Sequence, residues 1–511
     1  MTTTTIRTRD EPPLAPASTA LPRMHLRPVL AIAAGLVALE LAVAGRYGFH
    51  RDELYFLACA RHLDWGYVDQ PPLVPAMARL ATAVLGPSVV GIRMLPALAG
   101  GAAVVFTALT ARELGGGRRA QVLAALAAAT SPEVLAAFHL LSTIAFDLFF
   151  WSAITLLVVR LLRTQDDRLW LAVGAVAGLG LMNKFNVAFL FVGLVAGLVL
   201  GGRGHMLRSR WLWVGAVLAL VIWSPDLIWN ARHDWAAFAM LRSLHQENST
   251  LGASLVFIPA QLLVMGPVLV LLWFGGLRHL LRHHFARPLG LAYLVLLVLF
   301  AVTGAKPYYL AGMYFVLFAA GGAWAEGRLG ARRPPRGIRG WVALITAGGV
   351  LAVPLTLPIL PVSALAEGPW EGSINKDLSA TVGWESLVGQ IAKVSAALPA
   401  AARTHLVIFT GDYGAAGAVD LYGDRYGLPH AISGHNSYWW WGPGGAGNGA
   451  TTVAVDLPRP YLRTIFSEVI PAGGVATPDA VWSEERGDPI WICRGQKLTW
   501  AQAWPSARHY G

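Results

Sequence analysis

Long apolar segments recur along this chain and limit what it can fold into more than any other feature. A helix needs ~20 mainly apolar residues to cross the hydrocarbon core of a bilayer. Charged residues make up only 14% of the 511 residues, whereas soluble domains carry roughly 25%. We therefore expect a polytopic α-helical membrane protein with about eleven transmembrane helices. The apolar segments fall at 29–44, 92–112, 119–136, 141–162, 169–183, 185–201, 211–229, 252–277, 289–304, 308–325 and 340–360.

Arginines gather in alternate loops between these segments, and this pattern predicts the orientation of the chain. The positive-inside rule places such loops in the cytoplasm, together with the N-terminus. An odd number of spans then leaves the C-terminus outside. The formal net charge of +11 is explained by this orientation, so we expect no nucleic-acid partner. The loops carry Arg118 and Arg119, then Arg160, Arg163 and Arg168, then Arg203, Arg208 and Arg210, then Arg278, Arg282 and Arg287, and finally Arg328, Arg332, Arg333, Arg336 and Arg339.

Three regions are predicted from these patterns. Residues 1–27 have no apolar period and are expected to be a disordered cytoplasmic tail. Residues 28–360 are expected to form the transmembrane domain, with an outer loop at 46–91. Residues 361–511 are less apolar and long enough for a core of their own, so we expect an extracytoplasmic α/β domain. Within it, 405–410 resembles a buried strand, 411–414 a turn and 415–422 a helix.

Two features of the chain leave alternatives open. The first apolar segment ends in Ala42-Val43-Ala44, which resembles a signal-peptidase site, so a cleaved leader competes with the uncleaved anchor favoured by the many later spans. The two cysteines, Cys59 and Cys493, would form one disulfide or, as we favour, remain unpaired thiols.

The outer loop carries the strongest candidate site. Arg51, Asp52 and Glu53 follow the first span directly, and a carboxylate beside the bilayer is costly to keep without a function or a cationic partner. Residues 52–65 are expected to form an interfacial helix, and 73–85 a second one. On the first helix we expect Leu54, Leu57 and Ala58 toward lipid, and Arg61, His62 and Asp64 toward water. Asp52 would act as a general base, with Arg51 and His62 contacting substrate; alternatively the acids only pair with Arg51 and Arg61.

Further candidates lie at the outer ends of later spans. Asp147 opens one span and would bind a metal or an acceptor hydroxyl across from Asp52, or merely cap its helix. Lys306 would hold a lipid phosphate, with hydroxyls from Tyr308 and Tyr309, or snorkel to the headgroups. Lys184, between two spans, is a similar but weaker candidate.

A run of aromatic residues marks the C-terminal region. His435 and Asn436 precede Ser437-Tyr438-Trp439-Trp440-Trp441. Aromatic faces stack on sugar rings while His and Asn edges donate hydrogen bonds, so this segment is a plausible substrate-contact surface. Packing of the C-terminal region against the membrane domain would explain the tryptophans equally well.

The Asp52-Glu53 pair, Asp147 and the Lys306-Pro-Tyr-Tyr segment together resemble the GT-C glycosyltransferases over residues 28–325. The resemblance is greatest to the family 39 branch, which includes protein O-mannosyltransferases and lipid A aminoarabinose transferases. Such enzymes take a sugar from a polyprenyl-phosphate carrier and transfer it outside the cytoplasmic (inner) membrane. The resemblance implies that Asp52 is the catalytic acid with Glu53 beside it, that Asp147 is the acid of the second outer region, and that Lys306 contacts the donor phosphate.

This resemblance predicts an inverting transfer to a saccharide, lipid or protein acceptor. Asp52 would take the proton of the acceptor hydroxyl, and Lys306 or a divalent metal ion would stabilise the departing phosphate. The sequence has no evident nucleotide-binding glycine loop, in agreement with a lipid-borne donor. The main rival is a transporter or lipid flippase, but transporters usually place polar elements near the midplane within repeated halves. Here the acids lie at span ends and no repeat is visible.

Overall fold

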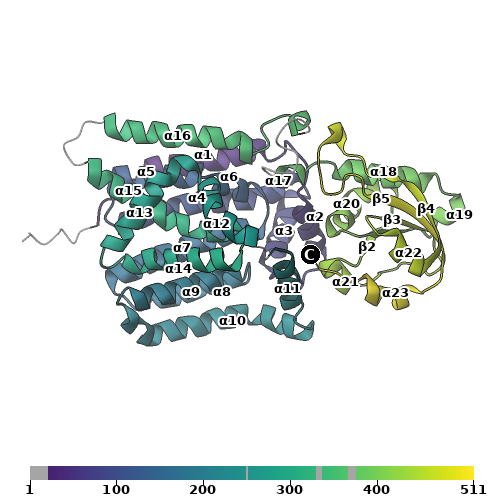
Figure 1. The fold of residues 1–511 in the computed structure, drawn as a ribbon, viewed down its shortest axis with the longest axis horizontal. Coiled ribbons are helices and arrows are strands. Elements are labelled where there is room, and N and C mark those ends of the chain that lie inside the picture. Colours follow the sequence, from purple (N-terminus) through teal and green to yellow (C-terminus); the bar gives the residue numbers. More distant parts are fainter. Residues whose placement is uncertain (1–20, 249–250, 330–335, 366–375, 511) are drawn as a thin grey trace, which may run out of the picture.

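The computed structural model describes residues 21–248, 251–329, 336–365 and 376–510. It consists of a helical bundle and a smaller region built around a sheet (Figure 1). Most of the tail expected at 1–27 lies outside the described residues. The chain therefore has the mostly helical architecture, with a C-terminal α/β region, that its sequence predicts.

Every predicted apolar segment forms helix, but the segments differ in length. Among the described residues, six elements are long and apolar enough to span a membrane, and two bent pairs raise the number to as many as eight. Three more predicted spans form helices of 13, 15 and 17 residues, shorter than the ~20 residues that a crossing normally needs. The long elements are α1 (Leu26–Val43), α4 (Val89–Glu113), α7 (Thr143–Thr164), α10 (Arg210–Arg232), η3 (Pro307–Met313) with α15 (Tyr314–Leu329), and α16 (Arg336–Thr356). The short ones are α8 (Leu169–Leu181), α9 (Asn186–Leu200) and α14 (Arg287–Thr303).

Two segments predicted as continuous are broken by proline. The pair α5 (Arg118–Thr130) and α6 (Pro132–His139) bends by 59°. The second pair bends by 89° where Gly266 adopts a φ of 103° directly before Pro267. Proline lacks the N–H that would continue the preceding helix, and the residue before it avoids helical backbone. This second pair comprises α12 (Leu251–Met265), η2 (Pro267–Leu269) and α13 (Val270–Arg282).

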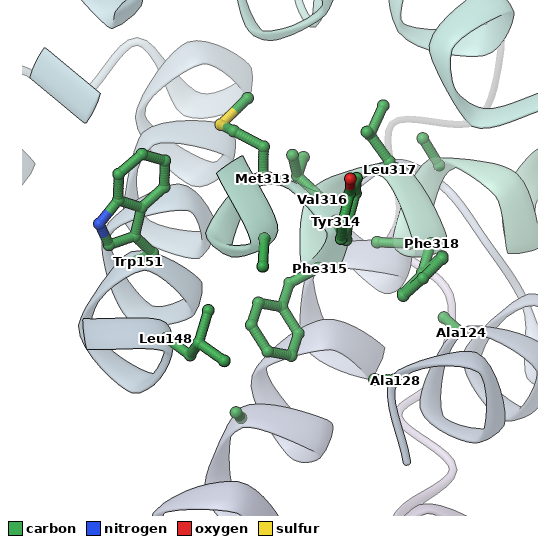
Figure 2. Packing of buried hydrophobic residues seen from close by; sticks show 14 of the residues in the cluster. Ala124, Ala128, Leu148, Trp151, Met313, Tyr314, Phe315, Val316, Leu317 and Phe318 are labelled. Carbon is green, nitrogen blue, oxygen red and sulfur yellow. The ribbon is translucent and has the colours of Figure 1, made fainter. Parts of the chain in front are cut away.

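Close glycine contacts hold the bundle together. A Cβ on Gly174 of α8 would lie 2.1 Å from the carbonyl oxygen of Gly215 of α10, and one on Gly276 of α13 would lie 2.0 Å from that of Leu317. Small residues let membrane helices approach this closely. In the bundle interior, α15 packs its aromatic side chains against α7 and α5, with Phe315 beside Leu148 (Figure 2).

The outer surface of the bundle is apolar. On α10, Trp213 and Val221 are each 62% exposed, and on α16 Leu351 is 70% exposed. Large apolar side chains in such number on the outside of a helix are the mark of a lipid-facing surface. The exposed faces therefore agree with a multi-pass membrane protein.

The C-terminal region contains a five-stranded sheet in the order β2-β1-β3-β5-β4. β1 pairs parallel with β2 and β3, whereas β5 pairs antiparallel with β3 and β4. All four residues of β1 are buried and α20 follows it, so the predicted strand–turn–helix unit is confirmed. The strands are β1 (Val407–Thr410), β2 (Ala431–Ser433), β3 (Thr452–Val455), β4 (Phe466–Gly474) and β5 (Pro489–Gln496). The helical elements are η4 (Val362–Leu365), α17 (Lys376–Ser379), α18 (Trp384–Ala396), α19 (Ala400–Arg403), α20 (Tyr413–Tyr422), η5 (Gly423–Tyr426), α21 (Asn436–Trp441), α22 (Arg459–Ile465), η6 (Pro478–Ala480) and α23 (Trp500–Ala507).

Helix α2 (Arg51–Arg61) lies between the bundle and the α/β region (Figure 1). The expectation that Leu54, Leu57 and Ala58 face lipid is wrong, because all three are buried. Gly417 of α20 allows the close approach, since a Cβ there would lie 2.8 Å from the Leu54 backbone. The helix also ends at Arg61 rather than at Trp65.

The remaining elements connect the bundle to this junction. The second predicted loop helix is confirmed as α3 (Leu73–Leu85), which exposes Leu80 and Val84. A further helix, α11 (Ala236–Asn248), follows α10, and a short η1 (Gly204–Arg208) precedes α10. Cys59 and Cys493 are both free and buried, so the disulfide alternative is wrong.

Candidate functional site

Asp52 lies in the first turn of α2, where His50 caps the helix. The Asp52 backbone N–H donates to Nδ1 of His50 over 3.1 Å, and the His50 N–H donates to Oε2 of Glu53 over 2.8 Å. The Asp52 side chain is 40% exposed. Its Oδ1 accepts a 2.8 Å hydrogen bond from the Tyr413 hydroxyl at the start of α20. The Asp52 carboxylate is thus oriented by a hydrogen bond from Tyr413 and is still accessible.

Glu53 is placed quite differently, although it is adjacent in sequence. Its side chain is fully buried and forms a two-point ion pair with Arg93 of α4, at 3.0 and 2.7 Å. The Leu141 backbone N–H also donates to Oε1 over 2.9 Å. Both oxygens are therefore occupied, and Glu53 holds the start of α2 against α4 and α7.

The alternative in which the two acids pair with Arg51 and Arg61 is only partly met. Arg51 Nε lies 3.9 Å from Asp52 Oδ1, and its guanidinium also pairs with Glu484. Arg61 instead donates to the Asp420 backbone oxygen over 2.8 Å.

The Glu53–Arg93 pair yields a stability prediction. Arg93→Met leaves a buried carboxylate without its cation, which typically costs about 3–5 kcal/mol. We expect the thermal unfolding midpoint of the purified protein in detergent to fall markedly. The double substitution Arg93→Met/Glu53→Leu removes both charges and is expected to recover much of the loss. A double variant no more stable than Arg93→Met would contradict this account.

A second group surrounds Lys184, in the turn between α8 and α9. Its Nζ lies 5.5 and 5.1 Å from the ring centroids of Tyr308 and Tyr309. Within the described ranges, no carboxylate lies within 4.0 Å of this ammonium group. Burial lowers the pKa of Lys184, and the carboxylate of Asp147 opposes that effect. Lys306, Glu133 and Asp52 also act electrostatically on it, so three acids, Asp147 among them, and two lysines share one electrostatic environment.

Asp147 is buried within this group. Its Oδ1 accepts from Trp151 Nε1 at 3.1 Å and its Oδ2 from Asn186 Nδ2 at 2.7 Å. The capping alternative for Asp147 is wrong, because the N-cap of α7 is Ser142, whose hydroxyl accepts from the Ala145 N–H. Lys306 is exposed at the start of η3, and Tyr308 and Tyr309 follow it half-buried.

His435 and Asn436 lie behind Tyr413 rather than beside Asp52. Nδ1 of His435 accepts from the Tyr413 backbone N–H at 3.3 Å and lies 3.5 Å from Oδ2 of Asp412. Asn436 is 1% exposed and adopts a φ of 48°. His435 is therefore linked to Asp52 through Tyr413, which contacts both residues.

The tryptophans at 439–441 do not all have the same surroundings. Trp439 and Trp504 exchange hydrogen bonds between indole N–H and backbone oxygen, both at 2.9 Å. Trp441 instead stacks on His62, with ring centroids 4.4 Å apart, at the far end of α2. The candidates Asp52, Asp147, Lys306, Tyr308 and Tyr309 thus share Lys184 as a common neighbour, by ring contact or electrostatics, whereas His62 lies at the other end of α2.

A metal ion has no clear set of ligands here. Among the residues that the structure describes, no three His, Cys, Asp or Glu side chains are grouped so that they could hold one. Both oxygens of Glu53 and of Asp147 already accept hydrogen bonds. Asp147, the metal ligand considered from the sequence, therefore belongs to no such group among the described residues.

Sequence reasoning missed several members of the site. Arg93 was signalled by its position inside an apolar segment, since a charge there normally needs a partner. Asn186 carried no comparable signal. Tyr413 lies 361 residues from the acid it contacts, and no local pattern links them.

Comparisons with known proteins show which families this chain resembles. The family described as dolichyl-phosphate-mannose-protein mannosyltransferase matches residues 69–229. Lipid A galacturonosyltransferase RgtD of Rhizobium johnstonii (strain DSM 114642 / LMG 32736 / 3841) is 27% identical over 236 residues, which cover 44% of this chain and 48% of the relative. The chain thus matches about half the length of that curated relative.

Solved structures extend the likeness to nearly the whole chain. ArnT from Cupriavidus metallidurans bound to undecaprenyl phosphate has a TM-score of 0.60 at 15% identity, covering 91% of this chain and 97% of that one. Its apo state gives 0.58 over the same shares. At this identity the likeness establishes the fold.

Proposed function

We propose that this chain, a glycosyltransferase of the GT-C type, transfers a hexosyl or pentosyl group from a polyprenyl-phosphate carrier to an acceptor hydroxyl. One observation carries the proposal: an accessible carboxylate, Asp52, shares an electrostatic environment with a lysine that lacks a carboxylate partner within 4.0 Å among the described residues. That combination provides a base for the acceptor and a cation for a departing phosphate.

Asp52 is the proposed general base. The Tyr413 hydroxyl occupies Oδ1, and the other oxygen is available to the acceptor. As the acceptor oxygen attacks the anomeric carbon, its proton passes to Asp52. The bond from that carbon to the phosphate oxygen breaks, and attack from the opposite face inverts the configuration. Glu53 and Arg93 position the helix that carries the base.

The leaving group is polyprenyl phosphate, which gains negative charge as the bond breaks. Lys184 and Lys306 are the proposed cations, with hydroxyls from Tyr308 and Tyr309. A partly buried ammonium group stabilises such a charge more than an exposed one does, because water screens it less. Asp147 and Asn186 would hold the neighbouring structure in place.

The similar proteins support the substrate classes. One solved relative contains undecaprenyl phosphate, and the family description names a dolichyl-phosphate sugar. The curated relative acts on lipid A according to its name. For this chain we propose a polyprenyl-phosphate sugar donor and a saccharide, lipid or protein acceptor.

The proposed location is the cytoplasmic (inner) membrane. The arginine-rich loops support a cytoplasmic N-terminus. With that orientation, α2 and the α/β region lie on the outer side, where the transfer would occur.

A reconstituted assay tests the proposal. Purified protein in proteoliposomes, given a radiolabelled polyprenyl-phosphate sugar and envelope acceptors, is expected to yield labelled glycoconjugate and free polyprenyl phosphate in equal amounts. Heat-inactivated protein serves as the control. Movement of intact labelled carrier between leaflets, without covalent transfer, would instead identify a flippase.

A further inference from the structure

A cavity of about 580 Å³ lies where the C-terminal end of α2 meets the α/β region. Its lining includes Arg61, the last residue of α2, and His62 directly after it, and also Asp420, His430 and Trp441 from the α/β region. A glycine-rich turn at 442–446 completes it. This volume falls within the range of ~300–1,000 Å³ typical of small-molecule sites.

The cavity is distinct from the site around Asp52. Arg61 lies nine positions after Asp52 on the helix, which corresponds to about 14 Å along the axis. Between them, Tyr55 and Cys59 are buried on the face that continues from Asp52 toward His62. A ligand in the cavity therefore does not touch the proposed base.

The cavity lining carries one permanent cation, Arg61, together with two imidazoles, His62 and His430, and one acid, Asp420. Arg61 uses Nη1 for the Asp420 backbone oxygen, which leaves most of its N–H groups for a ligand. The carboxylate of the single acid, Asp420, is engaged by other partners, because it accepts from the Tyr438 hydroxyl at 2.8 Å and from the Ala431 N–H at 3.0 Å. The same carboxylate lies 3.2 Å from Nδ1 of His430, and this contact raises the pKa of His430.

The remaining lining is suited to a sugar. His62 is held by its stacking on Trp441 and by a 3.1 Å contact from Nδ1 to the Ala58 oxygen, so Nε2 forms its outer edge. In the turn, Gly442 and Gly444 have φ values of 80° and 54°, and a Cβ on either would meet nothing within 4 Å. The turn therefore presents open backbone rather than side chains to a ligand.

We propose that this cavity binds an anionic saccharide, one that carries a carboxylate or a phosphate, as a part of the acceptor remote from the reacting hydroxyl. The guanidinium fork of Arg61 matches such an anion, while the aromatic wall and the imidazole edges contact the sugar. The assignment to the acceptor rests on the proposed glycosyl transfer. The site anchors an acceptor that is larger than one sugar unit.

Binding to the purified full-length protein in detergent tests this inference, with tryptophan fluorescence or calorimetry as the readout. The probes are glucose 6-phosphate, a glucuronate-containing disaccharide, maltose and inorganic phosphate. We expect the two anionic sugars to bind, and maltose and inorganic phosphate to bind at least about tenfold more weakly. Arg61→Gln is expected to weaken binding of the anionic sugars about tenfold, the typical loss of one charge-assisted hydrogen bond.

Two further variants keep the test decisive. His430→Gln alters a side chain that is 71% exposed, so the protein should fold, and it is expected to weaken binding severalfold. Arg463→Gln changes an exposed arginine of α22, outside the cavity, and is expected to leave binding unchanged.

Several results would overturn the inference. They are equal binding of maltose, equal binding of inorganic phosphate, no binding of either anionic sugar, or equal losses in Arg61→Gln and Arg463→Gln. Failure of the cavity and failure of the proposed transfer remain distinguishable. Anionic sugars that bind to a protein without transferase activity would contradict only the transfer, whereas transfer without such binding would contradict only the cavity.

Discussion

Asp52→Asn is expected to lower the rate of sugar transfer by about 10²–10⁴-fold, the usual contribution of a positioned general base. Asparagine keeps the size of the side chain and accepts a hydrogen bond from Tyr413, but it cannot take a proton from the acceptor. The loss should fall on kcat, because the substitution removes an interaction made only as the proton moves. Initial rates with saturating polyprenyl-phosphate sugar measure it directly.

The structure offers a matched control for this substitution. Asp424 is exposed in η5 of the α/β region, away from the proposed site. Asp424→Asn therefore makes the same chemical change and is expected to keep the full rate. Equal thermal unfolding midpoints would show that both variants fold. A folded Asp52→Asn protein that transfers sugar at the unaltered rate would remove Asp52 from the mechanism.

The adjacent acids show what a sequence can and cannot specify. The Asp52-Glu53 pair after the first span indicated a GT-C glycosyltransferase, and the family and fold comparisons confirm that resemblance. The sequence could not show that Asp52 would be accessible while Glu53 would be buried in an ion pair. Successive helical residues point about 100° apart, and only the positions of Arg93 and Tyr413 determine which acid is buried and which is accessible.

The apolar segments were predictable because burial in lipid and burial in protein both select apolar residues. The same ambiguity explains the error in α2. Its apolar face was predicted to meet lipid, but it meets α20, which is more than 350 residues later in the chain. A hydrophobic pattern identifies the face and not its partner. The bends near Pro132 and Pro267 were local and could have been anticipated from proline itself.

The cavity beside Arg61 shows that contacts between distant segments could not be predicted from the sequence. His62 and Trp441 were both candidates for substrate contact, but their stacking joins two segments that no periodicity connects. The sequence therefore gave no indication that the residues predicted to contact substrate fall into two separate groups in the structure.

Lys184→Met is expected to lower transfer by about 10²–10³-fold, comparable to the loss of one group that stabilises developing negative charge. Methionine retains most of the side-chain volume between the rings of Tyr308 and Tyr309, so packing is largely preserved. Lys306→Met should cost less, because that lysine is exposed and water screens its charge. Lys184→Arg keeps the charge and is expected to restore part of the rate.

Steady-state kinetics with varied polyprenyl-phosphate sugar provide kcat and KM for each variant. If Lys306→Met lost more activity than Lys184→Met, the donor phosphate would lie at the exposed lysine, and the partly buried ammonium group would serve only to balance the charge of Asp147.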